Sequence, residues 1–357
     1  MTSSSPVQPQ PRPLARHEVT SFSRLNAFKD CSQYFYLKYI YGLPEEKPFN
    51  KHLHIGAVVH SAIADHLDGG YELDDAFLIH LGRWLTKMGL EFDEEELVEK
   101  IAPAAELLWR CSLKCKDPEL VIRKENGDLL KDPISYPTQK FKKLCFEEGI
   151  TQSFSNLDQQ ASKQNQDFVA ESFAWIVARM FYLVRYFQVP GWVKENLFVE
   201  VGISTNTENR VSIPGTRVAL QGYIDWVVRH QDDRVVILDH KTSKKAPTPE
   251  NVFVDPQLNL YVWLLEQVYG IHADLIGINH LESGEVIATQ TDRRVVQSVV
   301  DYHRELQQQI EKGVYFKHDP TEYNTPCVKT NWKTGEITES CPFLSSCHPI
   351  FAQINGL

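Results

Sequence analysis

Hydrophobic positions along the chain change their spacing near residue 196, from a helical pattern to a strand pattern. Before that point, residues 22–41, 55–67 and most of 73–187 carry apolar side chains every three or four residues, which predicts helices. Ser21 or Ser23 is the candidate cap of the first of these helices. Residues 116–162 contain three prolines and read as loop-rich. We therefore expect residues 71–195 to form a large helical insertion.

Three runs of β-branched and apolar residues follow, and they predict three consecutive strands. The runs are LFVEVGIST, RVALQGYIDWVVRH and RVVILDHKT, and residues 231–233 make a hairpin-like connection between the second and the third. A helix is expected over residues 256–269, ended by Gly270. DLIGINHLE and the residues after SGEV predict two more strands, and residues 294–312 predict a final helix. This order predicts an α/β fold with a central sheet flanked by helices.

Composition fits a globular chain of 357 residues, with 42% hydrophobic and 24% charged residues. Residues 1–16 are rich in Ser, Pro and Gln, which predicts a disordered tail and not a secretory signal. No apolar run is long enough to span a bilayer, so we expect a cytoplasmic protein without membrane contact. The net charge of −10 excludes a protein that coats nucleic acid through bulk positive charge. It leaves room for an enzyme with a local basic groove.

Candidate chemistry is concentrated at the end of the third predicted strand. Residues two apart on a strand face the same side, so Asp239 and Lys241 share a face. If the second and third strands form a hairpin, Asp225 converges on Asp239. Two carboxylates at one point repel each other unless a cation lies between them, and oxygen ligands suit Mg²⁺ or Mn²⁺. Such a metal activates water and stabilises negative charge on a phosphate, with Lys241 beside the attacking water.

Gln257 and Tyr261 lie four residues apart on the next predicted helix and therefore share one helix face. That face would line the same cleft. The alternative interpretation makes Asp239 and Lys241 a structural ion pair and Asp225 an ordinary strand residue. For any one of these residues alone that alternative is favoured, whereas the ordered set favours a metal site.

Four short motifs resemble the PD-(D/E)XK nuclease superfamily, and in particular its RecB-type exonuclease branch. They are GAVVH at residues 56–60, GYID at 222–225, LDHKT at 238–242 and QLNLY at 257–261. Each motif alone is weak, but their order and spacing resemble that branch from about residue 22 to residue 347. The resemblance implies a restriction-endonuclease-like core, which is a central mixed sheet flanked by helices, and it implies hydrolysis of DNA phosphodiester bonds.

The resemblance also implies roles for individual residues. His60, Asp225 and Asp239 would bind the metal, and Lys241 would be the catalytic lysine. Gln257 and Tyr261 would form the motif that follows it. Glu200 is an additional candidate ligand, although a solvent-facing strand glutamate is nearly as good an interpretation. For His60 the alternative is an ordinary helix histidine.

Three late cysteines, Cys327, Cys341 and Cys347, lack the paired close spacings of zinc fingers and ribbons. A fourth thiolate would come from Cys31. By count, four thiolates suit an iron–sulfur cluster and zinc equally. RecB-type nucleases with a 4Fe-4S cluster have one early and three late cysteines that join the chain ends, and the resemblance to them implies such a cluster here. The gap from Cys327 to Cys341 is longer than in that group.

The other three cysteines, at positions 111, 115 and 145, are interpreted as ordinary thiols. Lys244 and Lys245 follow the third strand in a polar loop and are candidate phosphate contacts, with a solvated charge pair as the alternative. The expected segments are the tail (1–16), N-terminal helices with Cys31 and His60 (17–70), the helical insertion (71–195), the nuclease core (196–315) and the cluster-binding segment (316–357).

The expected substrate is DNA, single-stranded or with free ends, in recombination, repair or degradation. The sequence contains no GxxxxGK[ST] motif, so a helicase or recombination partner would be a separate polypeptide. The alternative function is a catalytically silent DNA-binding or assembly subunit that keeps the nuclease fold. A third interpretation is a redox- or zinc-stabilised scaffold.

Overall fold

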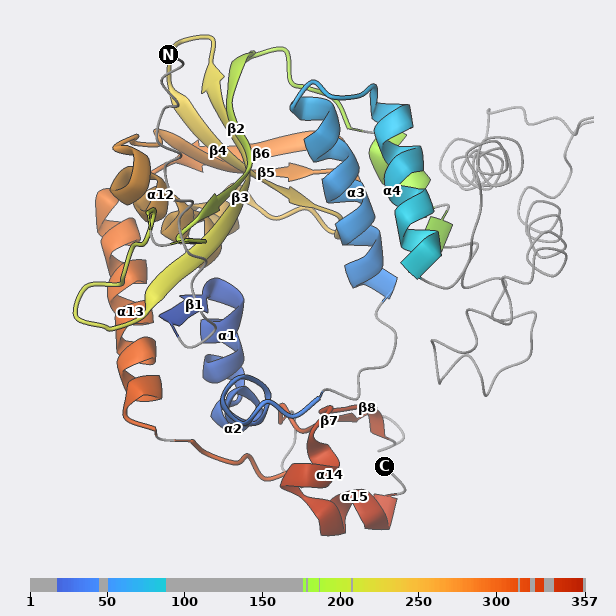
Figure 1. The fold of residues 1–357 in the computed structure, drawn as a ribbon, viewed down its shortest axis with the longest axis vertical. Helices are drawn as coiled ribbons and strands as arrows, with labels where there is room; N and C mark the ends of the chain where they lie inside the picture. The colour runs from blue at the N-terminus through green and yellow to red at the C-terminus, as the bar shows by residue number, and fades with distance from the viewer. Residues whose placement is uncertain are drawn as a thin grey trace, which may run out of the picture.

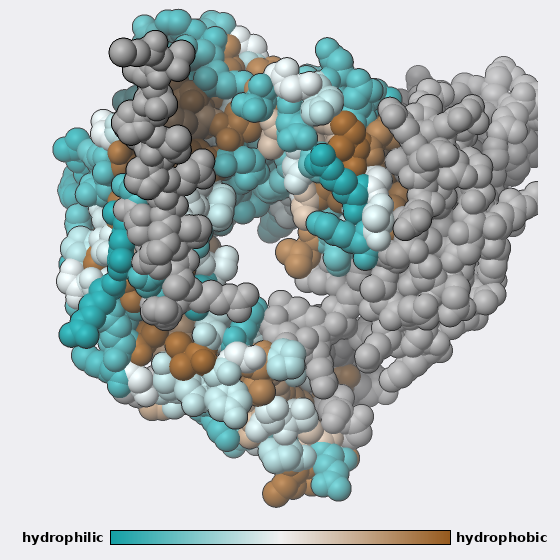
Figure 2. All heavy atoms as spheres, in the orientation of Figure 1, coloured by the Kyte–Doolittle hydropathy of each residue, from teal (hydrophilic) through white to brown (hydrophobic). Residues whose placement is uncertain are grey.

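The structure is a computed structural model of the whole chain (Figure 1). It describes residues 18–44, 51–87, 176–177, 179–185, 187–206, 208–313, 315–321, 325–330 and 337–355. The predicted tail and most of the predicted helical insertion lie outside these residues. Within them, no helix is long and apolar enough to cross a membrane. Figure 2 shows that hydrophilic side chains cover most of the described surface on this face.

A six-stranded mixed sheet forms the centre of the molecule. The sequence predicts a central mixed sheet and five of these strands, but not β1. Its main order is β1-β3-β4-β5-β6, and β2 also pairs with β3. The β4–β5 and β1–β3 pairs are parallel, and the others are antiparallel. The strands are β1 (Val19–Ser21), β2 (Val193–Ile203), β3 (Ala219–His230), β4 (Val235–Lys241), β5 (Leu275–His280) and β6 (Glu285–Gln290).

One face of the sheet packs against α3 (Lys51–Leu67), α4 (Leu73–Lys87) and the helical residues near 176–185. The sheet contributes alternate side chains to this core, including Trp226, Val228, Val236 and Leu238. All four are fully buried. Because burying a large apolar side chain contributes about 1.5–3 kcal/mol, this face fixes α3 firmly over β3 and β4.

The other face packs against α1 (Phe22–Asp30), α12 (Pro256–Tyr269) and α13 (Arg293–Glu311). Val235 and Ile237 of β4 belong to this core, one residue out of step with the side chains that face α3. The alternation predicted for a strand places Asp239 and Lys241 on this second face. The short helix α11 (Pro249–Phe253) leads into α12, whose end at Gly270 is where the sequence predicts it.

The first predicted helix, over residues 22–41, is wrong as a single element. Cys31 has an extended backbone, ends α1 and caps the next short helix, α2 (Ser32–Phe35), through its sulfur. A π-helix, η2, follows over Tyr36–Tyr41. Of the two candidate caps, Ser21 caps α1 by accepting from the Arg24 amide. Cys31 therefore lies at the junction of two helices and not within a helix.

The C-terminal residues form a hairpin of β7 (Val328–Thr330) and β8 (Ile337–Ser340), then α14 (Leu344–Cys347) and α15 (Pro349–Asn355). They lie beside α2, although about three hundred residues separate them from it in the sequence (Figure 1). The Gln33 amide donates to the Phe316 carbonyl, and the Phe316 amide donates to Ser32 Oγ. Ser32 and Gln33 are therefore held directly against Phe316. Figure 2 shows a hollow between this region and the sheet, and in Figure 1 α1 and α3 stand on either side of it.

Candidate active site

The β3–β4 hairpin brings the two predicted aspartates together. Trp226 pairs with Leu238, so the register places Asp225 opposite Asp239. The His240 amide donates to Asp225 Oδ2 at 2.8 Å, which locks the Asp225 carboxylate against β4. The convergence expected from the sequence is therefore present.

Glu200 reaches the same point from β2. The β2–β3 register pairs Val199 with Trp226 and Val201 with Ile224, so Glu200 lies opposite Asp225. Its φ of 47° is left-handed, which is rare for a non-glycine residue inside a strand. Such strain amounts to roughly 1–3 kcal/mol and is concentrated at functional sites. Glu200 is exposed and also lies beside Asp225, so its role as a metal ligand stays a prediction.

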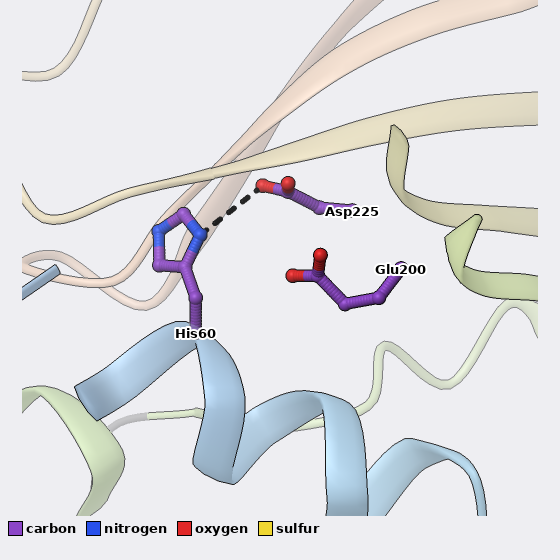
Figure 3. A group of neighbouring side chains, drawn as sticks. All are labelled: His60, Glu200 and Asp225. Atoms are coloured by element: carbon purple, nitrogen blue, oxygen red, sulfur yellow. Dashed lines mark ion pairs between the residues drawn. The ribbon is translucent and has the colours of Figure 1, made fainter. Parts of the chain in front are cut away.

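His60 approaches from α3, on the opposite side of the sheet from α12. Its Nδ1 lies 3.5 Å from Asp225 Oδ2. One ligand atom each from His60, Glu200 and Asp225 lies within 4.8 Å of the others. Figure 3 shows the three side chains pointing into one shared space. Among the described residues this trio is the one group of acidic, histidine or cysteine side chains close enough to hold a single ion.

Asp239 is outside that trio and belongs to an adjoining network. Its Oδ2 lies 2.6 Å from Lys241 Nζ, and its Oδ1 accepts from Gln257 Nε2 at 3.2 Å. Gln257 Nε2 also donates to Tyr261 Oη at 2.7 Å. Asp239 is buried, whereas the Lys241 side chain is 40% exposed, so the ammonium is reachable from solvent. The predicted strand face and helix face do meet.

The carboxylates of the site hold their protons more strongly than ordinary ones. Burial raises the pKa of Asp225 to about 6, although the His240 amide and Lys241 oppose this. Burial and the charge of Asp225 raise the pKa of Asp239 to about 6. Burial, Asp225 and Asp239 raise the pKa of Glu200, the most exposed of the three, to about 7. Crowded carboxylates of this kind need a cation to be fully ionised.

The basic groups respond to the same crowding. Burial lowers the pKa of His60, and this outweighs the charge of Asp239 that raises it. A neutral imidazole is the form that binds a metal. Burial lowers the pKa of Lys241, but Asp239, Asp225 and Asp255 together outweigh burial, so the net shift is upward and the lysine is charged.

The sequence of most of the chain, residues 19–117 and 136–348, matches the PD-(D/E)XK nuclease superfamily. The chain belongs to this superfamily. The matched ranges include all of the site residues described above. No curated protein is similar enough to the chain to count as a relative.

Gly222, the glycine of GYID, allows close packing between α12 and β3 beside the site. A Cβ at Gly222 would lie 3.0 Å from Leu264 Cδ1 and 3.1 Å from Tyr261 Cε1. Gly222 thus lets α12 approach β3 closely enough for Tyr261 to reach the site. By contrast, a Cβ at Gly56 would meet nothing within 4 Å.

Lys244 and Lys245 lie in the loop after β4, and both are exposed. The loop itself is anchored, because Arg179 donates to the Thr242 carbonyl and His280 Nε2 lies 2.8 Å from the Ser243 carbonyl. The two lysines are therefore open to a ligand beside Lys241. In the described part of the chain, neither forms an ion pair with a carboxylate of the site.

The four predicted cysteines converge beside α2. The hairpin pairs Val328 with Ser340, and the Cys341 amide donates to the Cys327 carbonyl at 2.8 Å, so these two cysteines face each other at the hairpin base. The longer gap noted in the sequence is therefore closed by the hairpin. Burial and the neighbouring thiols raise the pKa values of Cys327 and Cys341 to about 11. Burial and the neighbouring Cys31 thiol also raise the pKa of Cys347.

Sequence reasoning passed over His240, the middle residue of LDHKT. Its side chain points away from Asp239 and Lys241, which is why a strand-face argument omits it. The signal was a titratable residue directly between Asp239 and Lys241, at the position where the alternation of Val236 and Leu238 predicts another apolar side chain.

Proposed function

We propose that the chain is a Mg²⁺- or Mn²⁺-dependent DNA exonuclease of the RecB type that acts on single strands or free DNA ends. The observation that carries the proposal is the His60–Glu200–Asp225 trio directly beside the Asp239–Lys241–Gln257 network. Together they supply metal ligands and a cationic side chain at one exposed point. The motifs that resemble the RecB-type branch support the exonuclease assignment.

The residues of the trio fit a hard divalent cation. Mg²⁺ binds oxygen at about 2.1 Å, so ligand atoms on opposite sides of the ion lie about 4.2 Å apart. The ligand atoms of the trio lie within 4.8 Å of one another, which is the same range. A bound cation would also relieve the repulsion that raises the carboxylate pKa values. When bound, it supplies an activated water and stabilises charge on the phosphate.

Lys241 is the residue best placed to assist the reaction. Its ammonium is charged, held by Asp239 and partly exposed. From there it can hold the attacking water by hydrogen bond and stabilise the negative charge on the phosphate oxygens. Gln257 fixes Asp239 from α12, which keeps the ammonium at this position. Lys244 and Lys245 would bind phosphates of the entering strand.

We further propose that Cys31, Cys327, Cys341 and Cys347 bind a 4Fe-4S cluster. Cys31 raises the pKa of each of the other three thiols, which supports their closeness, and metal binding removes their protons. A tetrahedral zinc site with Zn–S bonds of about 2.3 Å places its sulfurs about 3.8 Å apart. Of these described cysteines, no three have sulfurs within 4.8 Å of one another. A 4Fe-4S cluster is a larger group that binds one thiolate on each iron, and the resemblance to RecB-type nucleases with such a cluster favours it here.

Digestion of end-labelled DNA tests the nuclease proposal. We expect Mg²⁺- or Mn²⁺-dependent degradation of linear single strands and no cleavage of circular single strands, because a circle has no end. Asp239→Ala should abolish the activity. Asp232→Ala is the matched control, since Asp232 lies on the exposed hairpin of the same strand pair. Cleavage of circles would replace exonuclease by endonuclease, and DNA binding without cleavage under any metal would favour the silent subunit.

Anaerobic purification tests the cluster proposal separately. We expect a brown protein with four irons and four sulfides per chain, following the cysteine ligation of such clusters. A colourless protein that contains one zinc per chain would overturn this assignment and leave the nuclease proposal intact.

A further inference from the structure

His240 is enclosed on all sides although it stands between Asp239 and Lys241. It is 2% exposed. The rings of Phe187 and Trp226 lie 5.8 Å and 5.9 Å from its own ring, between centroids. On the side of the site, the His60 ring stands at 85° to it at 5.8 Å. A polar ring thus occupies a place in the core where an apolar ring would fit.

Asn279 holds this ring in one orientation. The two residues are register partners on β4 and β5, and Asn279 Nδ2 lies 3.1 Å from His240 Nδ1. Since an amide nitrogen only donates, Nδ1 accepts and the ring proton is assigned to Nε2. Nε2 is buried with no hydrogen-bond partner in the described part of the chain. Burial lowers the pKa of His240 to about 3, so the ring is neutral.

The peptide groups of His240 face the candidate active site while its ring faces the core. Its amide donates to Asp225 Oδ2 at 2.8 Å. On its other side, the His240 ring meets the edge of the His60 ring. One residue therefore contacts a candidate carboxylate ligand through its amide and a candidate imidazole ligand through its ring.

We propose that His240 is a positioning residue: its ring, fixed by Asn279, packs against the His60 ring and sets the orientation of the peptide amide that aims Asp225 at the metal. This inference rests on the metal site of the proposed function. If His240 only filled the core, phenylalanine would serve as well or better, because it fills the same space without leaving a buried N–H unpaired. Groups that orient metal ligands typically contribute 10–100-fold to metal affinity.

The first test is Mn²⁺ binding by isothermal titration calorimetry, without DNA, on the full chain. We expect His240→Phe to weaken Mn²⁺ binding by about tenfold or more. His303→Phe is the matched control, because His303 is equally buried but lies in α13, where its Nδ1 lies 2.7 Å from the Val299 carbonyl. We expect the control to bind Mn²⁺ within about twofold of the wild type. Equal affinity in His240→Phe and wild type would overturn the proposal.

A double variant separates positioning from general stability. Asn279→Leu alone should lower the melting temperature, because it leaves His240 Nδ1 without a partner. His240→Phe with Asn279→Leu replaces both polar partners by apolar groups and should recover part of the melting temperature. We expect the Mn²⁺ affinity of this double variant to stay low, which supports positioning. Recovery of affinity together with stability would show that any well-packed residue suffices and would overturn the proposal.

The two proposals fail in distinguishable ways. A wild-type chain that binds Mn²⁺ and is sensitive to His240→Phe, yet cuts no DNA, would support positioning and contradict the nuclease. A wild-type chain that cuts DNA, with a His240→Phe variant that binds Mn²⁺ normally, would support the nuclease and contradict positioning by His240. A wild-type chain that binds no Mn²⁺ would overturn both.

Discussion

The candidate active site and the cysteine region bring distant residues together by different means. In the active site, strand register does most of the work: Glu200, Asp225 and Asp239 lie across from one another on β2, β3 and β4. In the cysteine region, Cys31 meets residues about three hundred positions later through a hairpin, short helices and two hydrogen bonds between segments. A site built on sheet register is rigid before any ligand binds. A site built on chain ends depends more on what it binds.

The two regions also differ in how their ionisable groups are neutralised. The carboxylates have internal partners: the Lys241 ammonium, the Gln257 amide and the His240 amide. The thiols Cys327 and Cys341 are held protonated by burial and by the neighbouring thiols of Cys31 and Cys347. We therefore expect loss of metal to leave the sheet site folded and to destabilise the cysteine region.

The largest expected effect comes from Asp225→Asn, which removes one candidate ligand charge. Loss of metal-assisted stabilisation worth several kcal/mol corresponds to a rate decrease of about 10³-fold. The iron content at the cysteines should be unchanged, because the two regions are separate. Measured cleavage rates and iron analysis on the same preparation check this. A parallel loss of iron would show that the two sites are not independent.

Cys341→Ser tests the other side of the comparison. We expect loss of the bound metal and a decrease in unfolding free energy of about 3 kcal/mol or more, since loss of a structural metal is among the severe single changes. Cys145→Ser is the control and should keep both metal and stability, because its thiol is not among the four. Metal analysis and thermal unfolding decide the outcome. Full stability in Cys341→Ser would mean that the chain ends hold together without a metal.

The raised pKa of Asp225 makes the stability of the chain depend on pH. Asp225 has a pKa of about 6 in the folded chain against an ordinary 3.8, so its contribution is fully present below about pH 4 and is lost as pH rises through 6. In EDTA, Asp225→Asn should therefore be more stable than wild type above pH 6, by on the order of 2 kcal/mol, with no difference near pH 4. Saturating Mn²⁺ should reverse the order at neutral pH. Melting temperatures at several pH values measure this, and a constant difference would contradict it.

Two glycines provide the smallest and most local contrast. Gly222→Ala should destabilise the chain by about 1–3 kcal/mol, since its Cβ would press on Tyr261 and Leu264. Gly56→Ala lies within α3 in open space and should stabilise it by up to about 1 kcal/mol. Unfolding by denaturant measures both. Equal effects would show that close packing of α12 on β3 is not what Gly222 provides.

Much of this arrangement follows from sequence periodicity. The two-residue spacing of Asp239 and Lys241 and the four-residue spacing of Gln257 and Tyr261 predict faces that do meet in the structure. The break at Cys31 was not predictable, because helical spacing continues through it and the next residues, Ser32 and Gln33, bond to the distant Phe316. The left-handed Glu200 and the ring contact of His240 with Asn279 were also beyond sequence patterns, because both depend on pairing between strands.

The most direct test of the active site is the cleavage rate of end-labelled single-stranded DNA by Lys241→Ala, measured beside Mn²⁺ binding. The account predicts cleavage at least about 100-fold slower than wild type, with Mn²⁺ still bound, because Lys241 acts on the water and phosphate and is not a ligand. Lys245→Ala, in the exposed loop nearby, should stay within a few-fold of wild type. Cleavage at the wild-type rate by Lys241→Ala would contradict the account.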